Sequence, residues 1–96
     1  MIISFGNQAT EDIFNGTSSK AARTIPSIIW NVAIRKLDMI NAAYDLKDLR
    51  IPPANRLEPL KGKRQGFYSI RVNDQFRIIF RWIDNGAKDV TIIDYH

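Results

Sequence analysis

Apolar residues recur every three or four positions between residues 25 and 45. They are Ile25, Ile29, Val32, Ala33, Leu37, Ile40 and Tyr44. This spacing puts them on one face of a helix, with polar residues facing water, so the pattern predicts a long helix packed on the core. Lys36 falls inside the apolar stripe, and its aliphatic stem is expected to lie along apolar surface while the ammonium extends outward.

Two shorter elements are predicted before this helix. Residues 2–5 form a β-like run, and Asn7 can cap a brief helix that continues to about Phe14. Asn15 and Gly16 then favour the end of that helix, and residues 17–20 have the composition of a loop.

The hydrophobic period changes from helical spacing to two after the Pro52-Pro53 pair. Alternating positions run through residues 68–72 and again through residues 76–82, separated by a polar turn. Such a pattern predicts a β-hairpin in which one face of both strands is buried.

The length of the hairpin loop sets which residues face each other. A two-residue loop would place Arg71 opposite Phe76 and mix core with solvent positions. A loop of residues 73–75 keeps the two faces separate, so we predict this register. Its pairs are Val72 with Phe76, Ile70 with Ile78, Tyr68 with Phe80, and Arg71 with Arg77. Two arginines directly opposite each other in a sheet repel, so the face that carries them is expected to bind an anion.

Residues 90–96 are predicted to form the last strand, after a turn at residues 84–86. Ile92 and Ile93 are both apolar, which favours a strand covered on both faces, as a central strand is. Within this strand Asp94 and His96 should point one way and Tyr95 the other. Taken together, these elements predict one α+β domain over residues 1–96. It has a short N-terminal strand and a three- to four-stranded antiparallel sheet with two helices packed on one of its faces.

Composition limits the classes of protein this chain can belong to. Its 96 residues are 45% hydrophobic and 25% charged, as in ordinary globular domains, and they contain no cysteine for a disulfide or thiolate metal site. The N-terminus lacks the basic and apolar regions of a signal peptide, and no apolar run is long enough to span a bilayer. A cytoplasmic protein without membrane contact is expected.

Positive charge is concentrated in the second half of the chain. Nine lysines and arginines but only three acidic residues lie between positions 47 and 82. This segment is therefore more positive than the whole chain, whose net charge is +4. Such a field favours a polyanionic partner, most commonly nucleic acid. Charge alone also fits a small basic domain that is merely soluble, so both interpretations stay open.

Two stretches carry a resemblance to a known family. They read NRLEPLKGKRQGFYSIRVNDQFRIIFRW at residues 55–82 and DVTIIDYH at residues 89–96. Together with the short MIISF strand and the long helix, they resemble the HigB toxins, a branch of the RelE-like toxins of bacterial type II toxin–antitoxin systems. The resemblance implies a RelE-like fold and a metal-independent endoribonuclease that cleaves translated mRNA in the decoding site of the ribosome and inhibits translation.

The same resemblance implies the partners of the chain. They are a helix-turn-helix antitoxin of the HigA kind, which neutralises the toxin and represses the shared operon, together with the ribosome and mRNA. Operator DNA would be contacted only through the antitoxin, and no cofactor is expected. The alternative is a weakly or non-catalytic homologue that binds RNA or the ribosome and acts mainly as antitoxin-bound co-repressor.

Carried over residue by residue, the family motifs indicate a set of candidate residues. The lysine of the PLKG turn is Lys61, and the terminal cluster is Asp94, Tyr95 and His96; the arginine after the hairpin aromatic is Arg77. Arg71 and Arg81 join them because they share the predicted face, and Lys63 and Arg64 complete the set of candidate phosphate-binding residues. Glu58 is a departure, since some relatives carry histidine before the proline of this turn.

These residue types suit metal-free cleavage of RNA. His96, the sole histidine, is suited to proton transfer near neutral pH, with Asp94 either orienting it or sharing the acid–base work. Lys61 and Arg77 would stabilise the phosphate, and Tyr95 would position the nucleotide. Which group is acid and which is base stays open.

Each candidate residue also has a purely structural reading. A terminal histidine is commonly a solvated end, an aspartate can cap a turn, and a tyrosine can pack in the core. Lysine before glycine is an ordinary turn, and arginines on a strand can discourage aggregation. Asp94 and His96 on one strand face do not make a metal site, so no metal is expected.

Overall fold

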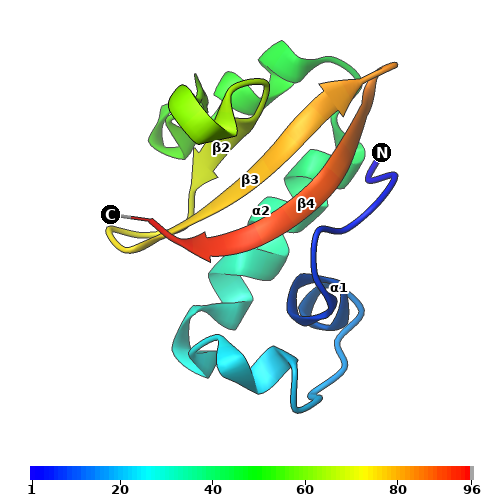
Figure 1. Ribbon diagram of the computed structural model, residues 1–96, viewed down its shortest axis with the longest axis vertical. Helices are drawn as coiled ribbons and strands as arrows, with labels where there is room; N and C mark the ends of the chain where they lie inside the picture. Colours follow the sequence, from blue (N-terminus) through cyan, green and yellow to red (C-terminus); the bar gives the residue numbers. More distant parts are fainter. Residues whose placement is uncertain (96) are drawn as a thin grey trace.

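Four antiparallel strands in the order β1-β2-β3-β4 form the sheet in this computed structural model, which describes residues 1–95. The strands are β1 (Glu58–Pro59), β2 (Tyr68–Arg71), β3 (Phe76–Ile83) and β4 (Gly86–Asp94). Two helices, α1 (Gln8–Phe14) and α2 (Trp30–Ala42), pack on one face of this sheet (Figure 1). The predicted α+β class is therefore confirmed. The predicted sheet had three to four strands, and the short strand β1, which has no alternating pattern of its own, brings the number to four.

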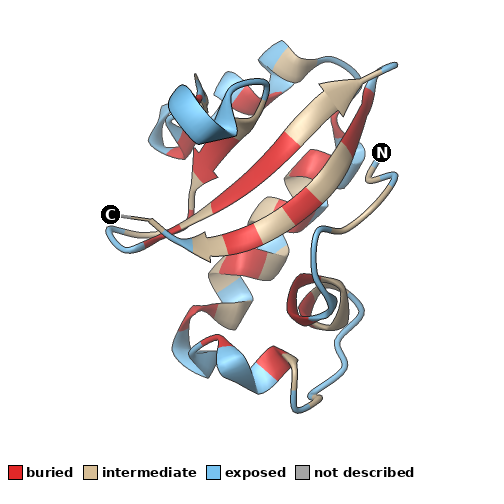
Figure 2. Ribbon diagram, in the orientation of Figure 1, coloured by how far each residue is buried: buried red, intermediate tan, exposed pale blue. Residues whose placement is uncertain are grey.

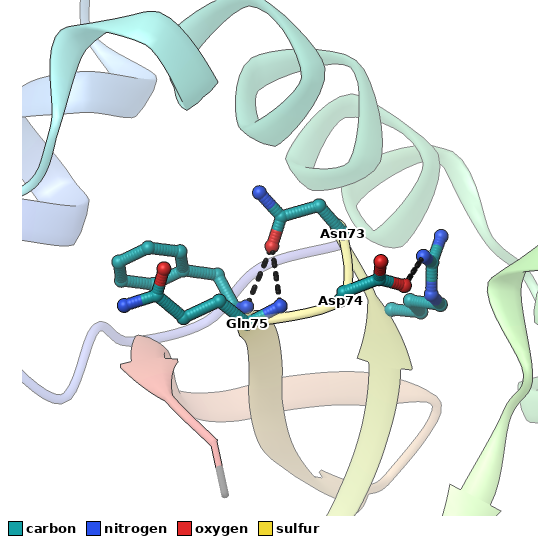
Figure 3. A network of polar contacts seen from close by, with 5 residues as sticks. Asn73, Asp74 and Gln75 are labelled. Atoms are coloured by element: carbon teal, nitrogen blue, oxygen red, sulfur yellow. Dashed lines mark hydrogen bonds and ion pairs between the residues drawn. The ribbon is translucent and has the colours of Figure 1, made fainter.

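The β2–β3 hairpin has the predicted three-residue loop. Its register pairs Tyr68 with Phe80, Ile70 with Ile78, and Arg71 with Arg77. The side chain of Asn73 holds the loop: its Oδ1 accepts the backbone N–H groups of Gln75 at 2.9 Å and Phe76 at 2.7 Å (Figure 3). Asp74, at the tip, forms an ion pair with Arg71. The hairpin is therefore closed by its own polar side chains.

Helix α1 begins and ends as predicted, whereas α2 is shorter than predicted. Asn7 caps α1 by accepting the Thr10 N–H at 3.0 Å. Residues 27–29 form a separate 3-10 turn before α2, and the chain becomes extended at Ala43. Tyr44, which the pattern placed on the buried stripe, is consequently 88% exposed. Helical spacing in the sequence therefore extends beyond the helix itself.

Strand β4 lies at the edge of the sheet, so the expectation of a central strand is wrong. The N-terminal segment and α1 cover this edge. Isolated parallel bridges join Ile2 with Ala87 and Phe5 with Val90, and the Thr10 hydroxyl accepts the Ile92 N–H at 2.9 Å. These bridges are what remains of the predicted N-terminal strand. Ile92 is buried and Ile93 half-buried, so two successive apolar residues are covered here in a strand at the edge of the sheet.

The core lies between the sheet and the helices. Its fully buried side chains include Phe80, Ile78 and Ile70 from the sheet and Leu37 and Ile40 from α2. Figure 2 shows buried stretches interrupted by half-buried ones along β3 and β4. In β3 the buried run at residues 78–80 breaks a simple alternation, because Ile79 is buried on the face opposite Ile78 and Phe80.

A buried amide joins α2 to the segment that leads into β1. Asn55 is fully buried, and its Nδ2 donates to the backbone oxygens of Leu49 at 3.1 Å and Ile51 at 3.4 Å. The Lys36 ammonium, which was expected to extend outward, instead donates to the Oδ1 of the buried Asn55 at 2.5 Å. Burial, followed by the nearby charge of Arg35, lowers the pKa of Lys36. These bonds determine where the chain emerges before β1.

Candidate functional site

A basic pocket lies between the PLKG turn and the end of β4. Its volume is about 310 Å³, and its lining consists of Leu60, Lys61, Lys63, Arg64 and Tyr95. Four of these five residues are sequence candidates. We call it the Lys61–Tyr95 pocket.

Two parts of the chain that are distant in sequence form this pocket. The turn is a short 3-10 element at Gly62–Arg64, anchored where the Leu60 N–H donates to the Phe67 carbonyl at 2.8 Å. Gly62 has φ +66°, a conformation that residues with a Cβ rarely adopt, and it lets Lys61 before it and Lys63 and Arg64 after it lie in one tight turn. Tyr95 is held by its backbone N–H, which donates to Gln75 O at 2.7 Å. The end of β4 thus lies beside the hairpin loop (Figure 1).

The Tyr95 ring lies against two guanidinium groups. The Cζ of Arg77 is 5.3 Å and that of Arg64 is 6.0 Å from the ring centroid. Cations over an aromatic face are attracted to its π electrons. Tyr95 therefore joins Arg77 of β3 to the cations of the turn, and the ring presents a surface on which a nucleobase can stack.

Arg77 is the most tightly held cation of the site. Its side chain is 13% exposed, and its Nη1 donates to the Ser69 Oγ at 2.8 Å and to the Arg56 carbonyl at 3.4 Å. The same Nη1 lies 3.2 Å from the Glu58 Oε1 in an ion pair. A cation fixed in this way is preorganised for charge that develops on a bound phosphate.

Glu58 belongs to the site, although the sequence suggested it only as a departure from a family pattern. Its carboxylate contacts Arg77 because β1 pairs with β2, which places Glu58 opposite Ser69. The Glu58 side chain is 47% exposed, so it is open to solvent and to a ligand. A two-residue strand leaves no periodic signal, so no pattern in the sequence indicated that this carboxylate faces Arg77.

Arg71 and Arg81 have carboxylate partners of their own and do not line the pocket. Arg71 pairs with Asp74 at the hairpin tip, and Arg81 pairs with Asp89 at 2.9 Å. A register shift between β3 and β4 near Arg81 accompanies a positive φ at Asp89 and marks a bulge. Arg71 still lies directly opposite Arg77, as predicted.

Asp94 and Tyr95 lie on different sides of the end of β4. Asp94 pairs with Phe76 in the sheet register, and its Oδ2 accepts the Gln75 Nε2–H at 2.9 Å. Strand alternation thus turns Asp94 away from the face that carries Tyr95, and Asp94 does not line the pocket. His96 lies outside the described residues, so its role stays a prediction.

Within residues 1–95, no three histidine or acidic side chains gather in a way that could hold a metal ion.

No helix in the described part of the chain is long and apolar enough to cross a membrane.

Comparison with known sequences gives consistent matches. A family model described as a RelE-like toxin of the type II toxin–antitoxin system HigB matches residues 4–96. The chain is 44% identical over 96 residues to the protein named Toxin HigB-1 of Vibrio cholerae serotype O1, covering 100% of this chain and 98% of the relative. It is also 36% identical over 61 residues to Endoribonuclease HigB of Proteus vulgaris, covering 64% of this chain and 65% of that one.

Solved structures share the fold at low sequence identity. A mutant of YafQ from E. coli has a TM-score of 0.64 at 12% identity, covering 98% of this chain and 93% of that one. The YoeB–YefM complex from Staphylococcus aureus contains a chain with a TM-score of 0.55 at 18% identity, covering 100% and 98%. At these identities the likeness establishes the fold alone.

Proposed function

The chain belongs to the HigB-like family of RelE-like toxins of type II toxin–antitoxin systems, and from this membership we propose that it is an endoribonuclease that cleaves translated mRNA on the ribosome. The observation that carries the proposal is the Lys61–Tyr95 pocket, which combines cations with an aromatic ring beside Arg77. That combination suits a nucleotide and its phosphate. The name of the Proteus vulgaris relative supports the same activity.

The reaction is a transesterification at phosphorus. A base removes the proton of the ribose 2′-hydroxyl, the 2′-oxygen bonds to phosphorus, and the bond to the 5′-oxygen breaks as an acid protonates that oxygen. Negative charge grows on the non-bridging oxygens, where Lys61 and Arg77 stabilise it. Tyr95 stacks on a nucleobase and thereby positions the nucleotide. Lys63, Arg64, Arg71 and Arg81 contribute phosphate contacts around this centre, the last two after exchanging their carboxylate partners for RNA.

Proton transfer falls to His96 and a carboxylate. The sequence suggests Asp94 for the second group, whereas the ion pair with Arg77 favours Glu58, whose Oε1 lies 3.2 Å from the Arg77 Nη1. A carboxylate beside the phosphate-binding cation is well placed to accept the 2′-hydroxyl proton, leaving His96 to protonate the leaving oxygen. Asp94, two positions before His96 in the chain, then orients the imidazole.

The partner we propose is a helix-turn-helix antitoxin, through which the toxin reaches operator DNA indirectly. A solved heterotetrameric YoeB–YefM toxin–antitoxin complex from Staphylococcus aureus contains a chain of this fold and supports an antitoxin partner. Free toxin acts in the cytoplasm, where translated mRNA is found.

A reconstituted translation reaction tests the proposed activity. The purified chain should cut mRNA on programmed ribosomes, and cutting should stop when the antitoxin is added. The same mRNA without ribosomes is the control for ribosome dependence, and we expect it to stay intact. If the chain binds the antitoxin but leaves ribosome-bound mRNA intact, the non-catalytic co-repressor is the correct function.

Replacing His96 by alanine tests the proton-transfer assignment. We expect His96→Ala to slow cleavage on ribosomes about a hundredfold, because a positioned acid or base contributes at least that much to such reactions. Single-turnover cleavage rates at saturating ribosome concentration measure the effect. Undiminished cutting would remove histidine from the mechanism and leave the carboxylates as the proton-transfer groups.

A further inference from the structure

Three polar residues of the described chain are buried, and one of them has a role that the fold does not explain. They are Thr10, Asn55 and Ser69. The Thr10 hydroxyl and the Asn55 amide bind backbone groups, and Asn55 also accepts from Lys36 of α2, so both residues join elements of the fold. The Ser69 hydroxyl instead accepts a hydrogen bond from Arg77, the cation proposed to stabilise the reacting phosphate.

Ser69 reaches Arg77 from the neighbouring strand. It is 0% exposed, lies in β2 between β1 and β3, and pairs with Glu58 on one side and Ile79 on the other. Its Oγ is 2.8 Å from the Arg77 Nη1, closer than Glu58 at 3.2 Å. These two side chains and the Arg56 carbonyl, at 3.4 Å, thus share one nitrogen of the guanidinium.

This sharing determines how the guanidinium is oriented. Within residues 1–95, every hydrogen bond or ion pair that the structure shows for the Arg77 side chain is made by Nη1. A guanidinium is planar, so holding Nη1 fixes the direction of its remaining edge, which carries the Nε and Nη2 donors. Without the Ser69 hydroxyl, the group is free to turn toward Glu58 and form a closer, two-point ion pair.

We propose that Ser69 is a positioning residue for RNA cleavage, because its buried hydroxyl holds Arg77 with the Nε and Nη2 edge directed at the phosphate. The inference rests on the proposed endoribonuclease function and adds a residue that does not touch the RNA. Ser69 also limits the ion pair with Glu58, which keeps the carboxylate available for proton transfer.

The test is a comparison of Ser69→Ala in two backgrounds. In the wild-type background we expect the single-turnover cleavage rate at saturating ribosome concentration to fall about tenfold, the usual effect of a lost hydrogen bond to a charged group. The ribosome concentration at half-maximal rate should change less than about twofold. In an Arg77→Ala background, Ser69→Ala should cause no further loss.

Two further variants separate hydrogen bonding from packing. Ser69→Cys keeps the size of the side chain but is a weak acceptor, so it should be as slow as Ser69→Ala. Ser4→Ala is the matched control, because it also removes a serine hydroxyl that accepts a hydrogen bond. The Ser4 Oγ accepts the Asp89 N–H at 2.9 Å, and Ser4 does not line the pocket. We expect its cleavage rate to stay at the wild-type level.

Three results would overturn the proposal: an unchanged rate in Ser69→Ala, full activity in Ser69→Cys, or an equal loss in both backgrounds. If the wild-type chain itself does not cut mRNA, the proposed function fails. NMR then tests, without any activity, whether Ser69 orients the Arg77 guanidinium. Restricted rotation of the Arg77 guanidinium should be visible in the wild-type protein and lost in Ser69→Ala. The same rotation in both proteins would overturn the inference independently of activity.

Discussion

Arg77→Ala is expected to slow ribosome-dependent mRNA cleavage about a thousandfold, the magnitude associated with losing a preorganised cation at a reacting phosphate. The guanidinium is 13% exposed and held by Ser69 and Glu58, so it is already oriented when RNA arrives. Removing it also leaves the Glu58 carboxylate without its cation, which adds negative charge where the phosphate must bind. Both effects act in the same direction.

Single-turnover cleavage of mRNA on programmed ribosomes measures this loss, with circular dichroism to verify the fold. Arg23→Ala is the matched control, because Arg23 is an exposed arginine that donates to the Ser18 carbonyl and lies outside the pocket. Its rate should stay within about twofold of wild type, since isolated surface charges contribute little. If both variants retain activity, Arg77 does not stabilise the reacting phosphate.

Phe80→Ala is expected to lower the free energy of unfolding by about 3–5 kcal/mol. Phe80 is fully buried in the centre of β3, and its ring centroid lies 6.3 Å from that of Tyr68 and 6.4 Å from that of Trp82. Alanine leaves a cavity that these neighbours cannot fill. Because a chain of this size has a total stability of only about 5–15 kcal/mol, much of the protein should be unfolded at moderate urea concentration.

Urea denaturation followed by tryptophan fluorescence measures the change in stability. Tyr44→Ala is the control that distinguishes structure from sequence pattern. The pattern placed Tyr44 in the core, but it is 88% exposed, so its replacement should change stability by less than about 0.5 kcal/mol. A large loss in Tyr44→Ala, or a small one in Phe80→Ala, would contradict the observed packing.

Local periodicity was enough to predict the hairpin in detail. The side-chain alternation of β2 and β3 has a period of two, and only a three-residue loop keeps their apolar positions on the same face. The observed register, with Arg71 opposite Arg77, confirms this. The same kind of reasoning was wrong at Tyr44, because α2 ends before the apolar stripe does, and at the edge strand β4, because segments distant in sequence cover it.

The candidate site was predictable in part. The PLKG turn and the terminal cluster were chosen by family resemblance, and the structure brings Lys61 and Tyr95 of these two motifs into one pocket. Alternation already separated Asp94 from Tyr95, and the hydrogen bond of Asp94 with Gln75 agrees with that separation. The resemblance marked Glu58, directly before the PLKG turn, only as a departure from the family pattern and did not pair it with Arg77.

The sequence by itself determined the α+β class, the hairpin register and the concentration of positive charge, because each depends on spacing along a short stretch of chain. Only the tertiary structure decided which charges meet. Glu58 and Ser69 contact Arg77 because β1 pairs with β2 and β2 with β3. These contacts depend on the path of the chain between strands, which no local pattern encodes, and they distinguish Arg77 from the other arginines of the chain.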